Sequence, residues 1–201
     1  MTIRYPNGKK FQKKLTQPPI HLAEQKKVQF ANRGQSFEEA INQTNDFYLR
    51  EQLACIHKKP TPVQVVRVEY PARSCAVIRE AYYRQASTTD YNGVFQGKYI
   101  DFEAKETKNK TCFPLQNIHA HQMIHMKNVM NAGGITFLLI HFRSLKETYL
   151  MYGKDLFFFW ERQQKGGRKS ITYEEVVTNG LKVPSIFHAP VHYLPILEKL
   201  T

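Results

Sequence analysis

Apolar and polar side chains alternate along the stretch Tyr-Ile-Asp-Phe-Glu-Ala-Lys near the middle of the chain, and this alternation predicts a β-strand. Successive side chains of a strand point to opposite faces, so Ile100 and Phe102 are expected to face a core. The other face then carries Asp101, Glu103 and Lys105. Two acids beside a lysine are unusual on a solvated face, and this strand is therefore the centre of a candidate site.

The residues before this strand contain signals for a helix and further strands. Ser36 and Glu39 have the spacing of a capping box, and apolar residues then follow at helical intervals, so a helix is expected to begin here. Strands are expected over 53–56, 63–70 and 76–83. A short helix capped by Ser74 is the alternative to the last of these strands.

The residues after the central strand predict three more helices and two more strands. Pro114 is expected to open a helix that the glycines at 133–134 end. The almost continuously apolar run that follows is typical of a strand buried on both faces. The expected elements are a helix over 114–132, strands over 135–142 and 148–152, helices over 155–164 and 172–178, and an extended tail. Strands interleaved with helices indicate an α/β fold with a mixed sheet.

Charge and cysteine content narrow the class of protein. The 201 residues include 29 basic and 17 acidic side chains, a formal net charge of +12, which favours a polyanionic partner such as nucleic acid. Three cysteines without a C-x-x-C pair suit free thiols in a reducing cytosol. No apolar run approaches the roughly 18 residues that span a bilayer, so a cytoplasmic protein without membrane contact is expected.

Residues 1–33 are expected to form a flexible basic arm, because they carry many lysines and arginines, two adjacent prolines and no apolar period. The arm ends at Arg33, which is a candidate DNA contact. A solvated tail without a binding role is the alternative.

A second basic segment spans about 57–84 and mixes cations with tyrosines, a combination that suits phosphate contact and base stacking. The alternative is an amphipathic hairpin with a solvated charged face. Lys108 and Lys110 add charge to the loop after the central strand. The candidate DNA contacts of the segment are Lys58, Lys59, Arg67, Arg73 and Arg84.

Asp90 is a candidate metal ligand. The turn signal Gln96-Gly97 allows a hairpin that returns Asp90 toward Glu103, and two converging carboxylates suit Mg²⁺, with Mn²⁺ as a substitute. A neighbouring Lys105 could polarise water or stabilise charge on a phosphate. Zinc is disfavoured, because Gln122 stands where a zinc helix has its glutamate.

The pattern Asp90-x12-Glu103-Ala104-Lys105 resembles the PD-(D/E)xK nuclease signature. The surrounding sequence is more specific, and it is similar to that of the bacterial RecU-type Holliday junction resolvases. The segments that carry this similarity are Arg4–Gly8, Asn32–Gly34, His57–Gln64, Ser87–Gly93, Tyr99–Lys110, Phe113–Leu115 and His121–Gln122.

The resemblance implies a restriction-endonuclease-like mixed sheet flanked by helices, with the 57–84 segment inserted as a hairpin-like stalk in a nuclease domain over 34–201. It implies that Asp90 and Glu103 bind the metal, that Lys105 is catalytic, and that Glu38 joins the site. From the residues alone, Glu38 is most simply interpreted as a helix-start glutamate that complements the helix dipole. Thr88 and Gln122 are further metal ligands by the same resemblance.

The function that the resemblance implies is Mg²⁺-dependent, symmetrical nicking of two opposed strands of a four-way DNA junction by a homodimer. This activity would serve homologous recombination, DNA repair and chromosome segregation in the bacterial cytoplasm, at the nucleoid, beside a strand-exchange recombinase and a branch-migration helicase. The alternatives are a related nuclease for other branched or duplex DNA, and a non-catalytic junction-binding scaffold.

Overall fold

A mixed β-sheet forms the centre of the fold. The computed structural model describes residues 36–72, 75–84 and 88–198. The residues from Gln35 onward form one unit, and the predicted arm with Arg33 lies outside the described residues. In chain order the elements are α1 (Phe37–Arg50), β1 (Cys55–Lys58), β2 (Val63–Ala72), β3 (Cys75–Tyr83), β4 (Tyr91–Phe95), β5 (Lys98–Thr107), β6 (Cys112–Pro114), a 3-10 turn (Leu115–Asn117), α2 (Ala120–Asn131), β7 (Ile135–Phe142), β8 (Glu147–Tyr152), α3 (Gly153–Gln164), β9 (Ser170–Thr172), α4 (Tyr173–Asn179), β10 (Leu181–Lys182) and α5 (Leu194–Leu197).

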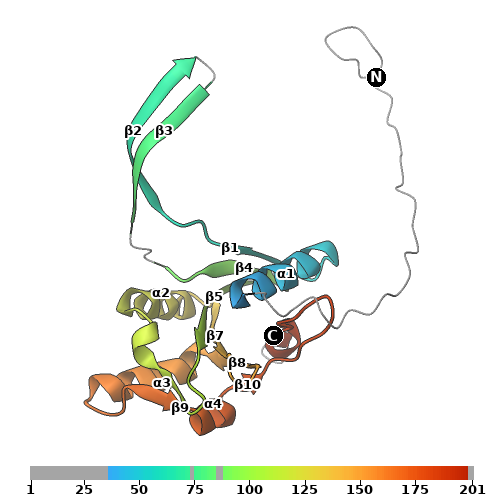
Figure 1. Ribbon diagram of the computed structural model, residues 1–201. Coiled ribbons are helices and arrows are strands. Elements are labelled where there is room, and N and C mark those ends of the chain that lie inside the picture. The colour runs from blue at the N-terminus through green and yellow to red at the C-terminus, as the bar shows by residue number, and fades with distance from the viewer. Residues whose placement is uncertain (1–35, 73–74, 85–87, 199–201) are drawn as a thin grey trace, which may run out of the picture. The chain divides into compact units, whose positions relative to one another are not determined.

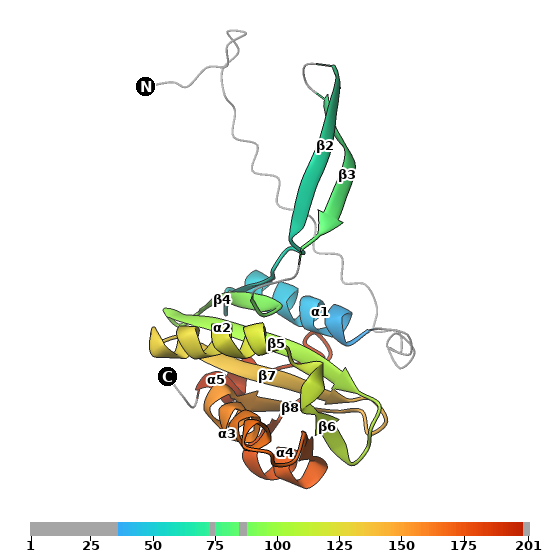
Figure 2. The same ribbon diagram turned by 90° about the vertical axis from the view of Figure 1, so that its left-hand side faces the viewer.

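The main sheet has six strands in the order β1-β4-β5-β7-β8-β10 (Figures 1 and 2). Strands β5 and β7 are parallel, whereas the other neighbouring strands are antiparallel. A parallel pair needs a long crossover, and the chain supplies it with β6, the 3-10 turn and α2. The predicted α/β class with a mixed, restriction-endonuclease-like sheet is confirmed.

Each face of the sheet has its own core. Phe137 and Leu139 of β7 pack with residues of α1 and the C-terminal segment, and Leu138 and Ile140 pack on the opposite face with residues of α2 and α3. The continuous apolar run of β7 therefore reflects burial on both faces, as predicted. The tail is packed against the body, and it includes the short helix α5.

Helix α1 begins where its capping box predicts. The Ser36 hydroxyl accepts a hydrogen bond from the Glu39 backbone N–H, and the Glu39 carboxylate accepts one from the Ser36 N–H. The buried face of the helix includes Ile41 and Tyr48. The Tyr48 hydroxyl accepts a hydrogen bond from the Leu194 N–H, which ties the C-terminal segment to α1.

Strands β2 and β3 form a separate two-stranded hairpin inserted between β1 and β4. Their side chains are almost all exposed, and Figure 2 shows the hairpin standing clear of the main sheet. The predicted stalk is therefore present as a hairpin. The alternative of a short helix capped by Ser74 is wrong, because residues from Cys75 to Tyr83 pair as a strand with β2.

The expectation that Pro114 opens a helix is also wrong. Pro114 ends the short strand β6, which pairs with β9, and its backbone is extended. Helix α2 starts at Ala120 instead. All three cysteines are thiols outside any disulfide bond, as expected. Within the described ranges, no helix is both long and apolar enough to cross a membrane.

Candidate active site

Strand β5 carries the candidate site on the face that it turns toward α2. Ile100 and Phe102 lie in the core on the other face, as the alternation predicts. Asp101 and Glu103 are both completely buried. Because charged groups are rarely buried without partners, the contacts of these two acids define what the face can do.

Asp90 and Glu103 come together through the β4–β5 hairpin. Tyr91 pairs with Phe102 across the two strands, which brings the preceding Asp90 beside Glu103. Burial is the main cause that raises the pKa of Glu103 to about 8, and the hydrogen bond and negative charge of Asp90 raise it further. Glu103 therefore holds a proton at neutral pH when no cation is present.

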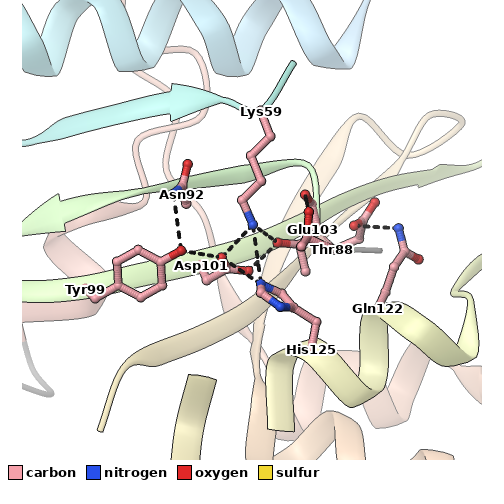
Figure 3. Close-up of polar contacts among 9 residues, drawn as sticks. Lys59, Thr88, Asn92, Tyr99, Asp101, Glu103, Gln122 and His125 are labelled. Atoms are coloured by element: carbon pink, nitrogen blue, oxygen red, sulfur yellow. Dashed lines mark hydrogen bonds and ion pairs between the residues drawn. The ribbon is translucent and has the colours of Figure 1, made fainter. Parts of the chain in front are cut away.

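Lys105 and Gln122 contact the two oxygens of Glu103. The Lys105 ammonium lies 2.8 Å from Glu103 Oε1 and opposes the rise of the Glu103 pKa. Gln122, from α2, donates from Nε2 to Glu103 Oε2 at 2.7 Å (Figure 3). The Gln122 oxygen accepts from the His119 N–H at 2.9 Å. Gln122 therefore presents its nitrogen to the site and orients Glu103.

The residues present fit a divalent cation of the magnesium type. Glu103 Oε1 is buried and makes no hydrogen bond of regular geometry, and the Lys105 ammonium 2.8 Å away is its ion-pair partner. In the part of the chain that the structure describes, no three His, Cys, Asp or Glu side chains form a metal cage. Mg²⁺ does not need one, because it typically binds one or two carboxylates, several waters and substrate phosphates.

Glu38 lies on the α1 side of the same region. It lines a cavity of about 220 Å³ together with Asp90 and Ala104. Its carboxylate pairs with Lys58 at 2.5 Å. After burial, the charge of Glu38 is the next cause that raises the pKa of Tyr91, ahead of Asp90 and Glu103. These observations place Glu38 in the same acidic neighbourhood as the carboxylate pair.

Thr88 lies close to the site (Figure 3). Its hydroxyl donates to the Thr89 carbonyl at 3.3 Å. Thr89, which is buried, donates to Asp101 instead.

Sequence reasoning missed the role of Asp101 as the centre of a polar cluster (Figure 3). Its side chain contacts Lys59 at 2.6 Å, Tyr99 at 2.9 Å and His125 at 3.1 Å, in addition to Thr89. Alternation had placed Asp101 on the correct face. No local pattern could supply its partners, since Lys59, Thr89 and His125 all lie outside β5.

The remaining candidate DNA contacts are spread over the hairpin and a loop. Arg67 pairs with Glu69, and Arg84 donates to Gln64 at 3.2 Å. Lys108 and Lys110 are exposed. Lys59 is not a free surface cation, since Asp101 pairs with it. Arg73 and Arg33 lie outside the described residues.

Comparison with known proteins agrees with this geometry. A family model described as RecU, recombination protein U, matches residues 32–199. The chain is similar to proteins named Holliday junction resolvase RecU from Bacillus thuringiensis (strain Al Hakam), Bacillus cereus (strain AH820) and Bacillus anthracis (strain A0248). Each is 55% identical over 198 residues, which cover 98% of this chain and 98% of the relative.

Proposed function

This chain belongs to the RecU family, and from that premise we propose that it is an endonuclease that resolves Holliday junctions in homologous recombination. The observation that carries the proposal is the contact of Asp90 with Glu103 beside Lys105 on one face of β5. We further propose that the reaction depends on Mg²⁺, with Mn²⁺ as a substitute, and that it also serves DNA repair and chromosome segregation.

The proposed chemistry is hydrolysis of a phosphodiester bond. Asp90 and Glu103 would hold Mg²⁺, with the main-chain carbonyl near Ala104 as a further ligand. When bound, Mg²⁺ lowers the pKa of a coordinated water and neutralises phosphate charge. Gln122 holds Glu103 in place through its Nε2. The Lys105 ammonium either orients the attacking water or stabilises the negative charge that develops on the phosphate.

The β2–β3 hairpin supports selection of a branched substrate. Tyr70, Tyr82 and Tyr83 on this hairpin are 71%, 60% and 84% exposed. Exposed aromatic rings among arginines suit stacking on unpaired bases and contact with phosphates. A hairpin with these side chains has the chemistry to enter a junction, where bases and backbones of four strands meet.

A symmetrical substrate favours a symmetrical enzyme. A four-way junction has two equivalent cleavage positions on opposed strands, and a homodimer with twofold symmetry supplies two matched sites. We therefore propose a homodimer that acts in the bacterial cytoplasm, at the nucleoid. A strand-exchange recombinase would form the junctions, and a branch-migration helicase would move them.

A cleavage assay on a synthetic mobile junction tests this proposal. Purified protein with Mg²⁺ should nick two opposed strands symmetrically, and EDTA should stop the reaction. Asp90→Asn should bind the junction without nicking it. Equal cleavage of junction and linear duplex would identify a less selective nuclease. Binding without cleavage in Mg²⁺ or Mn²⁺ would identify a junction-binding scaffold.

A further inference from the structure

A buried ion pair joins the base of the β2–β3 hairpin to the strand that carries the catalytic groups. We propose that Lys59 and Asp101 form a positioning pair. This pair holds the metal-binding carboxylates in a fixed position relative to the hairpin that selects the substrate. This inference rests on the proposed function and deepens it. It assigns a task to the one acid on the catalytic face that the proposed chemistry does not use.

Lys59 lies on the first connection of the hairpin, directly after β1. Its backbone N–H donates to the Asp90 carbonyl at 2.7 Å. Its Nζ donates to Thr89 Oγ1 at 2.9 Å, and both of these partners lie on the returning connection. Lys59 therefore links the two connections of the hairpin, and it does so at the residue that is proposed to bind metal.

The same ammonium also reaches the catalytic strand. Lys59 Nζ lies 2.6 Å from Asp101 Oδ2 and 3.4 Å from the His125 ring. The Lys59 side chain therefore contacts a residue close to each proposed metal ligand. Thr89 directly precedes Asp90, and Asp101 is two residues before Glu103 on the same face of β5.

The Asp101 cluster is built to be rigid. Its carboxylate is completely buried, whereas the Lys59 side chain is 17% exposed. Asp101 Oδ1 accepts from Thr89, and Oδ2 accepts from Tyr99 as well as Lys59. A buried carboxylate with partners on both oxygens has one favourable arrangement, because each displacement leaves an unpaired charge or donor in the interior.

A consequence for function follows from this arrangement. A displacement of either connection of the hairpin would move Thr89 or Lys59. Asp90 would move with them, because it follows Thr89 in the chain and its carbonyl accepts the Lys59 N–H hydrogen bond. Contacts that orient metal ligands without binding the metal typically change metal affinity or activity by about 10- to 100-fold when they are removed. Lys59 is expected to act on the reaction in this way, through Asp90 and not by contact with DNA.

The test compares Lys59→Met, Lys59→Arg and the double variant Lys59→Met/Asp101→Asn with the wild type. Lys59→Met leaves a buried carboxylate unpaired, which threatens folding. In the double variant the acid is also neutral, so a folded protein without the ion pair can be studied. Lys182→Met is the matched control, because it removes a lysine from the ion pair with Glu147 on a distant strand.

Three measurements separate positioning from stability and from DNA contact. The first is binding of Mn²⁺ to DNA-free protein, followed as loss of the free-ion signal in electron paramagnetic resonance. The second is junction affinity in EDTA, where no cleavage occurs. The third is the single-turnover cleavage rate at limiting and at saturating Mg²⁺. Unfolded protein lowers the amplitude of cleavage, whereas misplaced metal ligands raise the Mg²⁺ concentration at which the rate is half-maximal.

The double variant should bind Mn²⁺ about tenfold more weakly and cleave about 10- to 100-fold more slowly at limiting Mg²⁺. Its junction affinity should stay within about twofold of the wild type, Lys59→Arg should recover part of the loss, and Lys182→Met should match the wild type. Unchanged Mn²⁺ binding, or a loss confined to junction affinity, would overturn the inference. If wild-type protein cleaves no junction, the proposed function fails instead, and the Mn²⁺ measurement still decides whether the pair positions the ligands.

Discussion

Replacement of Glu103 by glutamine is expected to stabilise the metal-free protein at alkaline pH. Burial, and then the hydrogen bond and charge of Asp90, raise the pKa of Glu103 to about 8. Such an acid stabilises the folded state below its unfolded pKa, and this stability is lost as the pH rises through the folded pKa. Glutamine has a similar shape and is neutral at every pH, so the variant avoids this loss.

The size of the effect follows from the two pKa values. With about 4.5 in the unfolded chain and about 8 in the folded protein, Glu103 lowers the free energy of unfolding at pH 9 relative to pH 5 by at most about 4 kcal/mol. The difference between Glu103→Gln and wild type should therefore be larger at pH 9 than at pH 5 by up to that amount. Cleavage should be absent, because the neutral amide does not hold the metal as a carboxylate does.

Urea unfolding in EDTA at both pH values measures this difference. Glu174→Gln, which changes an exposed acid in the first turn of α4, is the control and should show no comparable dependence on pH. Mg²⁺ at pH 9 should raise the stability of the wild type more than that of the variant, since the ion binds the charged carboxylate. The reasoning is refuted if Glu103→Gln and wild type differ by the same amount at pH 5 and pH 9.

Three other changes give separate tests. Gly93→Ala should destabilise the protein by several kcal/mol in urea unfolding, because the added Cβ would lie 2.2 Å from the Cys55 carbonyl oxygen on β1. Tyr193→Phe should cost about 1–3 kcal/mol in the same assay, since it removes the buried hydroxyl that donates to Asn45 and leaves that acceptor unpaired. Lys105→Met should lower the single-turnover cleavage rate by about 10²- to 10³-fold while junction affinity in a gel-shift assay changes little, because the ammonium is proposed to act on the reacting phosphate; a variant that cleaves normally would remove Lys105 from the mechanism.

Local patterns were enough to predict much of the fold. Strand β5, the buried strand β7 and the start of α1 each follow from side-chain periodicity or a capping box, which depend on neighbouring residues only. The hairpin that returns Asp90 to Glu103 was likewise predictable, because its turn contains Gly97 with a positive φ of 76°. These features concern residues that are close in the sequence.

The features that the sequence did not predict depend on contacts between distant segments. Pro114 matched the usual first position of a helix, but pairing of β6 with β9 holds it in an extended conformation. Lys59 and Asp101 are 42 positions apart. A lysine in a basic segment is most simply interpreted as a phosphate contact, and only the folded chain shows that its charge is already paired.

The two buried acids of β5 differ in the charge of their surroundings, and this difference supports the separate tasks proposed for them. Around Asp101, one carboxylate and the Lys59 ammonium give a net charge of −1 + 1 = 0, and donors contact both oxygens. Around Glu103, two carboxylates and Lys105 give −2 + 1 = −1 when both acids are ionised. A divalent cation together with one singly charged phosphodiester would bring that sum to zero. The Asp101 cluster gains nothing from a cation, because Lys59 already supplies the charge there, whereas the Asp90–Glu103 pair keeps a negative charge that the proposed divalent cation would compensate.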